Sequence, residues 1–349
     1  MDTLTHALFG ALIGRATQPR VPGPNTLPMG RRMLVGAAAA AFPDLDFITS
    51  YLSPLSYLHH HRGITHSLVL LPLWAMLVAV ICAAIWRWKP PWQAYLGIAA
   101  IGIGSHIVGD LITAFGTMIF APVSDARYAL SATFIIDLWF TGIILAGLAA
   151  VATWRTSRAP AVAGVAVLAG YVALQVVLQN RAIDFGEDYA RRSGMSGAKV
   201  SAMPRPVSPF NWTVFVAHDT HYRYAHVNLI RKVAPKPLDA DTGSLARLDA
   251  AYRPLSDAHW LRSERYGASA EEAAIVRAAY THPDFRFFRW FAAYPTLLKV
   301  DTGACAWFHD LRFMTPGRDG TPFRYGMCRA ENGAWRPYQL VGEEKKPVY

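Results

Sequence analysis

The sequence predicts a mainly α-helical protein: a multi-span helical membrane domain over residues 1–180, followed by a small α+β soluble domain over residues 181–349. Residues 1–180 hold 16 charged side chains (10 Lys/Arg, 6 Asp and no Glu), whereas residues 181–349 hold 42. Long apolar runs fall only in the first part, and short runs alternating aromatic and polar residues fall in the second. A hydrophobic content of 53% with three cysteines excludes disorder and a disulfide-dense scaffold.

Four apolar stretches of the first part are long enough to cross a bilayer, which takes about 20 helical residues. They are residues 67–86, 92–113, 133–153 and 161–179. Two shorter stretches, 4–13 and 33–42, precede them. We expect these to form a helical hairpin, either as short spans or as re-entrant helices packed against the four.

Basic residues in the loops predict the orientation in the membrane. If the segments alternate in direction, two loop residues, Arg62 and Arg127, lie on one side. Eight lie on the other: Arg15, Arg20, Arg31, Arg32, Arg87, Lys89, Arg155 and Arg158. Because Lys and Arg are enriched in cytoplasmic loops, we expect a multi-pass protein of the bacterial inner membrane with residues 181–349 outside the cytoplasm. The net charge of +10 then favours contact with anionic membrane lipid, and no nucleic-acid partner is expected.

The second part reads as an α+β domain. Strands are predicted over 211–216, 222–229, 304–313 and 322–329, and helices over 271–280 and 285–298. The aromatic residues of 285–291 are expected to be core, and His218 and His221 are expected at the surface beside a turn. The sequence contains no P-loop, dinucleotide fingerprint or GxSxG motif. We expect this domain to cover a site in the membrane domain or to select its substrate.

Ionisable residues of the membrane domain cluster on one side. All six Asp and all six His of residues 1–180 fall at the predicted non-cytoplasmic ends: Asp2, Asp44, Asp46, Asp110, Asp125, Asp137, His6, His59, His60, His61, His66 and His106. Such groups are costly in a membrane domain unless paired, ligated or solvated, so their clustering predicts a functional site. The alternative is a set of helix caps and loop residues that face water.

Four motifs predict that this site binds metal. The HIVGD segment (106–110) places an imidazole and a carboxylate at i and i+4 on one helical face. PDLD (43–46), HRGITH (61–66) and MDTLTH (1–6) supply the other donors. The predicted ligands are His6, Asp44, Asp46, His61, His66, His106 and Asp110. Mixed nitrogen and oxygen donors suit zinc, with manganese or iron as alternatives, and seven donors leave a two-metal centre open.

Three further residues are candidates for catalysis. Asp137 or Asp46 would act as general base if its carboxylate is not fully engaged by metal. Arg62 would either clamp an anionic phosphate or pair structurally with an Asp. His59 and His60 are expected to be loop histidines.

The motifs at 1–6, 42–46, 61–67 and 106–116 together resemble the LexA-regulated, inner-membrane metal-dependent hydrolase family of bacteria. The resemblance covers about residues 1–180. It implies a multi-span membrane protein with a hydrolase-type metal centre, and it carries no substrate.

The residues favour a membrane-embedded, metal-dependent hydrolase. A site at the outer membrane face can draw an amphiphile from the leaflet, so the expected substrate is a phosphoester or lipid-type molecule. The alternative is an ion or metal transporter with an intramembrane His/Asp site. That alternative predicts ionisable residues at mid-span or on both faces, together with related halves. A third alternative is a structural stress protein with a vestigial site.

Two cysteines lie on candidate strands that flank a predicted turn at 316–320. Cys305 and Cys328 would then face each other, and in an oxidising compartment they form a disulfide. The alternative is two packed thiols. Cys82 lies within a predicted span and is expected to stay free.

Overall fold

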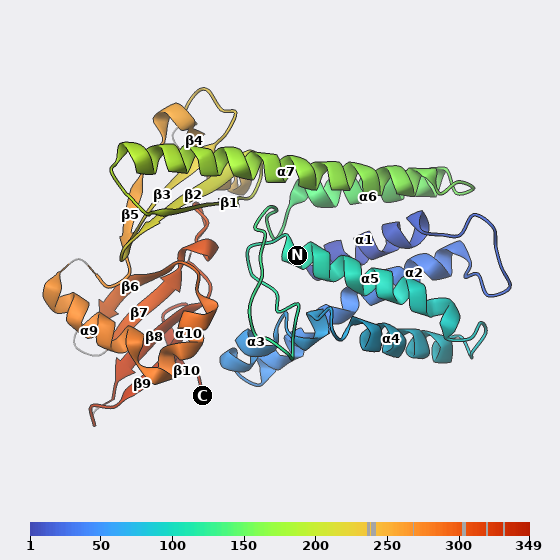
Figure 1. Ribbon diagram of the computed structural model, residues 1–349, viewed down its shortest axis with the longest axis horizontal. Coiled ribbons are helices and arrows are strands. Elements are labelled where there is room, and N and C mark those ends of the chain that lie inside the picture. The colour runs from blue at the N-terminus through green and yellow to red at the C-terminus, as the bar shows by residue number, and fades with distance from the viewer. Residues whose placement is uncertain (236–237, 239–241, 268, 302–304, 319, 331) are drawn as a thin grey trace. The chain divides into compact units, whose positions relative to one another are not determined.

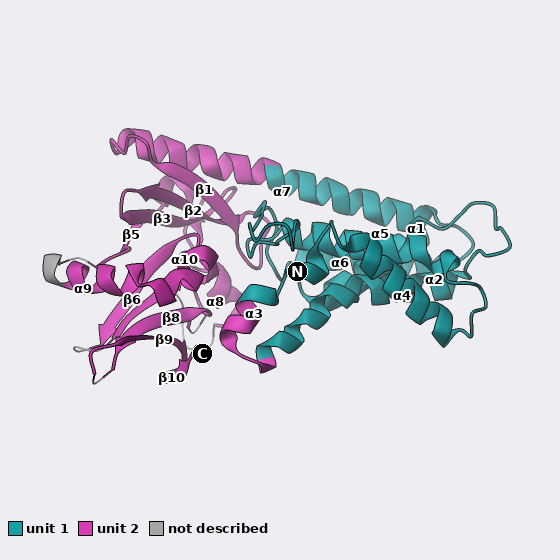
Figure 2. Cartoon of the chain, turned by 60° about the horizontal axis from the view of Figure 1, so that its bottom comes forward, with its two compact units in different colours: residues 1–50, 59–176 teal, residues 51–58, 177–349 magenta. Residues whose placement is uncertain are grey.

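The computed structural model describes residues 1–235, 238, 242–267, 269–301, 305–318, 320–330 and 332–349 (Figure 1). The chain divides into two compact units: a helical unit of residues 1–50 and 59–176, and a C-terminal unit of residues 51–58 and 177–349 (Figure 2). The predicted order of an apolar helical region followed by a sheet-containing domain is confirmed.

The elements of the chain up to residue 192 are helices joined by loops, the longest of them over residues 112–137. The helices are α1 (Thr3–Ala16), α2 (Met29–Ala41), the 3₁₀ helix η1 (Phe42–Tyr51), α3 (Pro54–His60), the 3₁₀ helix η2 (Ile64–His66), α4 (Leu71–Ile85), α5 (Gln93–Leu111), α6 (Leu138–Thr153) and α7 (Ala159–Arg192). The apolar runs therefore form helices, as lipid requires of backbone that has no water to bond.

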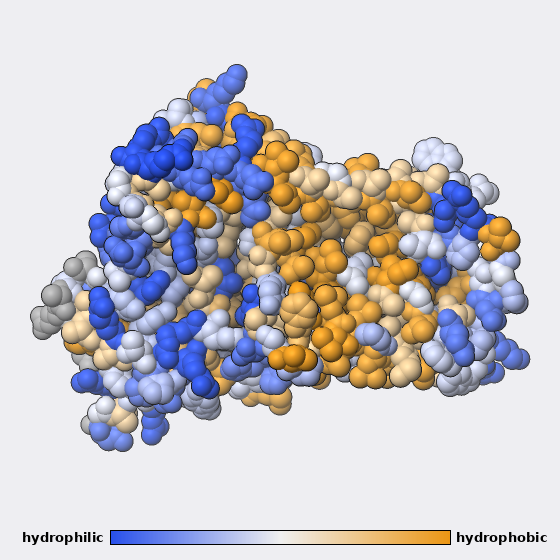
Figure 3. Space-filling view, viewed as in Figure 1, coloured by the Kyte–Doolittle hydropathy of each residue, from blue (hydrophilic) through white to orange (hydrophobic). Residues whose placement is uncertain are grey.

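Several of these helices are long and apolar enough to cross a membrane. Among the described residues, Met29–Tyr51, Gln93–Leu111 and Ala159–Arg192 meet this test, and Figure 3 shows the apolar surface of this region. The pair Pro54–His66 and Leu71–Ile85, bent by 80°, adds a fourth crossing if it counts as one span. The helix expected as a short apolar segment over 33–42 is part of a longer helical segment, because η1 directly follows α2.

The helix expected over 67–86 begins four residues late, at Leu71. Ser67 has extended backbone angles, and its hydroxyl accepts hydrogen bonds from the backbone N–H groups of Val69 and Leu70. A serine that bonds to its own local backbone competes with helix formation. The expected start of this span at residue 67 was therefore wrong. The segment that precedes α4 carries the buried side chain of His66.

Glycines allow α1, α2 and α5 to pack in close contact. A Cβ on Gly102 of α5 would lie 2.8 Å from the Ala39 Cβ and 2.9 Å from the Gly36 carbonyl oxygen of α2. Membrane helices approach closely where small residues meet, because lipid supplies no hydrophobic force between them. The close packing brings the polar ends of these helices together.

The three short loops 17–28, 86–92 and 154–158 lie at one end of the helical unit (Figure 1). Guanidinium groups bind backbone carbonyls there: Arg32 Nε donates to Gly14 at 2.9 Å, and Arg158 Nη1 donates to Gln18 at 2.8 Å. These arginines satisfy carbonyl groups at and just beyond the C-terminal end of α1.

The C-terminal unit contains two five-stranded sheets. In the first, β1 (Lys199–Pro204), β2 (Asn211–His218), β3 (His221–Asn228) and β4 (Arg253–Pro254) follow one another, and β5 (Leu261–Glu264) also pairs with β3. The second is an antiparallel meander of β6 (Pro295–Asp301), β7 (Cys305–Asp310), β8 (Arg324–Arg329), β9 (Trp335–Val341) and β10 (Glu344–Pro347). Short helices complete the unit: α8 (Ser244–Asp249), η3 (Leu255–Asp257), α9 (Ala270–Thr281), η4 (Pro283–Phe285), α10 (Arg286–Phe291) and η5 (Leu311–Phe313).

The last turns of α7 cover the first sheet. A Cβ on Gly186 would lie 2.6 Å from methyl groups of Val200 and Val214, so the helix backbone lies directly on β1 and β2. Leu178 and Ala182 join Trp212 in the same buried cluster. The glycine sets the distance between helix and sheet.

The aromatic run 285–291 is largely core, as expected, with four Phe side chains at most 6% exposed. The helix expected over 285–298 was wrong beyond Phe291, because Ala292 turns extended and β6 begins at Pro295. A run of large apolar residues fits a buried helix or a buried strand equally well. Residue 304, the first of an expected strand, and residue 319 of the expected turn lie outside the described residues.

Cys305 and Cys328 form a disulfide between β7 and β8, where they are paired directly across the two strands. Cys82 is buried and free, as expected. The predicted hairpin geometry is therefore confirmed.

Candidate metal centre

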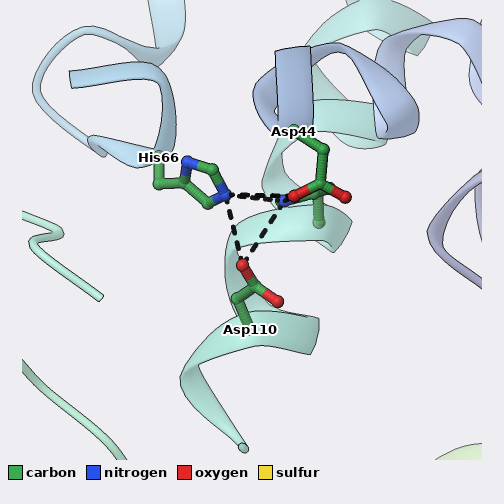
Figure 4. Close-up of side chains that lie close together, drawn as sticks. Asp44, His66 and Asp110 are labelled. Atoms are coloured by element: carbon green, nitrogen blue, oxygen red, sulfur yellow. Dashed lines mark hydrogen bonds and ion pairs between the residues drawn. The ribbon is translucent and has the colours of Figure 1, made fainter. Parts of the chain in front are cut away.

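Four segments of the helical unit bring the predicted polar residues together. α1 carries His6, η1 carries Asp44 and Asp46, η2 carries His66, and the end of α5 carries His106 and Asp110. All six side chains are less than 9% exposed. Figure 4 shows the side chains of Asp44, His66 and Asp110 converging from three of these segments.

Within the described residues, one group offers donor atoms that all lie within 4.8 Å of one another: Asp44, His66, His106 and Asp110. The Nε2 atoms of His66 and His106 are 2.9 Å apart. The Oδ2 atom of Asp110 lies 3.2 Å and 3.5 Å from them, and Oδ1 of Asp44 lies 3.8 Å and 3.6 Å away. Two imidazoles and two carboxylates thus surround one point.

Hydrogen bonds fix which ring nitrogens carry protons. His106 Nδ1 lies 2.6 Å from the carbonyl oxygen of Ala40, which can only accept, so Nδ1 donates. His66 Nδ1 lies 3.0 Å from Thr65 Oγ1 and 3.3 Å from Asp46 Oδ2. The Thr65 hydroxyl already donates to Asp46, so its oxygen accepts from His66. When both rings are neutral, each therefore turns an Nε2 lone pair toward the same point.

The donor set fits a transition-metal cation. Two Nε2 lone pairs 2.9 Å apart repel unless a proton or a cation lies between them. The buried Oδ2 atom of Asp110 accepts no well-formed hydrogen bond, although Arg62 Nε lies 2.9 Å away. Two nitrogen and two oxygen donors suit zinc, manganese or iron better than calcium, which prefers oxygen alone.

Three predicted ligands lie outside this group and contact its members or its neighbours. His6 Nε2 lies 3.1 Å from Asp110 Oδ1, and its ring stacks on His106 with centroids 3.7 Å apart. His61 Nδ1 is 2.7 Å from Asp46 Oδ1, so these two residues bind each other. Gly109 leaves room for His6, because a Cβ there would lie 3.0 Å from the imidazole.

Arg62 is 1% exposed and ion-pairs with Asp110 through Nε, while its Nη1 donates to Thr113 Oγ1 at 2.9 Å. Its guanidinium also lies 4.9 Å from the centre of the Phe115 ring. Of the two roles considered above, these contacts are those of an Arg paired with an Asp.

Asp137 lies at the start of α6. Its hydrogen bonds are to residues of α6 and α7, and not to Asp44, His66, His106 or Asp110. Its Oδ1 caps the helix by accepting from the N–H groups of Trp139 and Phe140, and its Oδ2 accepts from the Tyr171 hydroxyl at 2.8 Å. His59 and His60 end α3 and are exposed.

Several supporting groups had little or no signal in the sequence. The Ala40 carbonyl that orients His106 is a backbone atom and leaves no trace in residue type. Thr3 Oγ1 donates to Asp44 Oδ2 at 2.7 Å, and the Met1 amino group donates to Asp110 Oδ1. Thr3 lies in the 1–6 motif and Thr65 in the 61–66 motif. Their places in these motifs, beside the candidate ligands, were the one sign in the sequence that they support the site.

Comparison with known proteins identifies a family for the helical part of the chain. Residues 1–182, which contain the whole site, match a family model described as YdjM inner membrane protein. A relative from Bacillus subtilis (strain 168), named "Uncharacterized protein YfhP", is 27% identical over 185 residues, or 52% of this chain and 55% of that protein. The match thus spans about half the length of this relative. No solved structure gives a significant match.

Proposed function

The chain belongs to the YdjM inner membrane protein family, and on this premise we propose that it is a membrane-bound, metal-dependent hydrolase. One observation carries the proposal: two imidazole Nε2 atoms and two carboxylates converge on one buried point, with His66 Nε2 and His106 Nε2 2.9 Å apart. Buried ionisable residues in a membrane domain are costly and mark function.

Asp44, His66, His106 and Asp110 would hold the cation. When bound there, a divalent metal supplies a Lewis acid and a water of lowered pKa. The chain's own residues orient the donors: Ala40 holds His106, and His6 and Arg62 hold the two oxygens of Asp110. A centre fixed in this way suits hydrolysis of a phosphoester or an acyl ester.

The 3₁₀ helix η1 supports a lipid-type substrate. Along it, Asp44 and Asp46 point inward, at 7% and 8% exposure, whereas Leu45, Phe47 and Ile48 are 50–64% exposed. Residues that alternate in this way put an apolar surface beside the carboxylates. An amphiphile in the leaflet would contact that surface with its acyl chain while its polar group lies near the metal donors.

We further propose that the centre lies at the extracytoplasmic face of the inner membrane. The basic loops at the opposite end of the helical unit support this, because positive loops stay in the cytoplasm. The disulfide supports it from the other part of the chain, since such bonds persist in oxidising compartments. The C-terminal unit would then be extracytoplasmic.

Purified protein in detergent tests the activity. It would be stripped with a chelator, reloaded separately with Zn²⁺, Mn²⁺ or Fe²⁺, and assayed on soluble phosphodiesters and on phospholipid micelles. We expect hydrolysis that depends on metal and is lost in His66→Ala, with His59→Ala as the matched histidine control. Wild-type protein that binds metal and hydrolyses none of these, but moves the ion across sealed vesicles, would replace the hydrolase with the transporter alternative.

A further inference from the structure

Asp46 is surrounded by donors that all come from one short segment, residues 61–66. Its Oδ1 lies 2.7 Å from His61 Nδ1. Its Oδ2 accepts from the Arg62 backbone N–H at 3.0 Å and from Thr65 Oγ1 at 2.8 Å, and it lies 3.3 Å from His66 Nδ1. Both oxygens of this buried carboxylate are therefore engaged by protein.

Asp44, two residues earlier, has different surroundings. Its Oδ2 accepts from Thr3, but its Oδ1 faces the two Nε2 atoms of His66 and His106 at 3.8 Å and 3.6 Å. The difference follows from η1, because a 3₁₀ helix has about three residues per turn, so residues i and i+2 point about 120° apart. The two carboxylates of the PDLD motif thus face opposite sides of the His66 ring, one at Nε2 and the other at Nδ1.

We infer that Asp46 is not a metal ligand but the positioning residue of the centre, an inference that rests on the proposed function. Asp46 Oδ2 lies 3.3 Å from His66 Nδ1 and holds the Thr65 hydroxyl, whose oxygen accepts the Nδ1 proton of His66. These contacts fix the tautomer and aim Nε2 at Asp44, His106 and Asp110. Carboxylate–histidine–metal arrangements of this kind make the imidazole a better ligand.

The same carboxylate closes the loop that carries His66. Arg62 adopts φ of +60°, in the left-handed region that is unfavourable for a residue with a side chain, and its N–H is held by Asp46. The bond from His61 Nδ1 holds that ring beside Asp46 as well. One side chain therefore sets the backbone of residues 61–66, the orientation of His66 and the position of His61.

The test compares the same substitution at two carboxylates in η1, Asp46→Asn and Asp44→Asn. Full-length protein in detergent would be titrated with Co²⁺ in competition with a chromophoric chelator, and the visible absorption of bound Co²⁺ would be recorded. We expect Asp46→Asn to keep the wild-type stoichiometry and absorption spectrum at saturating Co²⁺, with affinity weakened about 10- to 100-fold. Asp44→Asn should change the spectrum, because a ligand atom is lost.

A milder variant guards against misfolding. Thr65→Val removes only the hydroxyl between His66 and Asp46, and it should weaken Co²⁺ binding with the spectrum unchanged. The inference is overturned if Asp46→Asn alters the spectrum or stoichiometry as Asp44→Asn does. Should Asp46→Asn fail to fold, unchanged affinity in Thr65→Val overturns it instead. Wild-type protein that binds no Co²⁺ would refute the proposed function itself, an outcome seen before any variant is measured.

Discussion

Gly10 of α1 and Gly36 of α2 face each other backbone to backbone. A Cβ on Gly10 would lie 2.2 Å from the Gly36 carbonyl oxygen, and a Cβ on Gly36 would lie 2.3 Å from the Gly10 carbonyl oxygen. No side chain fits at this crossing. Because α1 carries His6 and α2 leads into Asp44, the crossing sets the distance between two parts of the candidate metal centre.

Gly36→Ala should therefore force α1 and α2 apart. We expect the free energy of unfolding to fall by about 1–3 kcal/mol, the usual cost of overpacking. We also expect weaker metal binding. Thermal unfolding in detergent and metal content would measure both effects. Gly30→Ala is the matched control in the same helix, since nothing lies within 4 Å of its Cβ position. Equal effects of the two substitutions would show that the crossing tolerates a methyl group.

Removing a ligand should remove metal and activity together. His106→Ala and Asp110→Ala are each expected to lower bound metal, and hydrolysis should fall to the rate of chelated wild-type protein, while insertion in the membrane is retained. Metal analysis and the phosphodiester assay on one preparation give both readings. His221→Ala in the C-terminal unit should change neither. Full metal occupancy and activity in His106→Ala would show that His106 and Asp110 have a structural role and do not bind metal.

Reporter fusions test the orientation. A phosphatase that is active only outside the cytoplasm, fused after Gln179 or at Tyr349, should be active, because the basic loops favour the cytoplasm. A cytoplasm-dependent fluorescent protein at the same positions should stay dark. The reverse pattern would place the metal centre at the cytoplasmic face.

The disulfide should contribute to the stability of the C-terminal unit. Cys305 and Cys328 are separated by 23 residues, and a loop of this size corresponds to about 3 kcal/mol in the chain-entropy model. The Cys305→Ser/Cys328→Ser double variant should unfold at lower denaturant concentration, and Cys82→Ala should not. Mass spectrometry that finds both residues alkylated without reductant would contradict the bond.

Acid should weaken the C-terminal unit through His226. Burial, together with the nearby Arg205 guanidinium, lowers the pKa of His226 from 6.5 to about 3. Since the folded pKa lies below the unfolded one, the neutral ring contributes its full stability above about pH 6.5. That contribution declines as the pH falls from 6.5 toward 3, because only the unfolded chain takes up the proton.

Hydrogen exchange of peptides from β2 and β3 would measure this effect between pH 7 and pH 4. Wild-type protein should lose protection more steeply than His226→Gln, each compared at the same pH. Thr213, whose hydroxyl bonds His226 and Arg205, offers a second variant, Thr213→Val. Parallel pH profiles for wild type and His226→Gln would assign the acid sensitivity to other groups.

The apolar helices were predictable because lipid permits little else, so a run of apolar residues maps directly onto a helix. The start of α4 was not, because a serine side chain decides it locally. The strands β1, β4 and β5 had no clear alternation, and β4 contains only two residues. Short strands take their pairing from neighbours distant in sequence, and no local pattern records that.

The candidate site shows the same division. Residue types and spacing identified every member of the Asp44, His66, His106 and Asp110 group as a candidate. They could not separate Asp44 from Asp46, because both are carboxylates in one motif and both are buried. The direction each side chain takes depends on the 3₁₀ form of η1, and the tautomer of His106 depends on the carbonyl of Ala40.

The bond from Tyr171 to Asp137 has a consequence for how α7 sits against α6. Gln175 Nε2 donates to the Tyr171 hydroxyl at 2.7 Å, so two polar residues one turn apart on α7 lead to the carboxylate that begins α6. Lipid supplies no hydrophobic force that holds two apolar helices in one orientation, so hydrogen bonds between helices help to fix their relative rotation. Here the buried bond from Tyr171 of α7 to Asp137 would be lost if α7 turned about its axis, so this bond favours one rotational setting of the two helices.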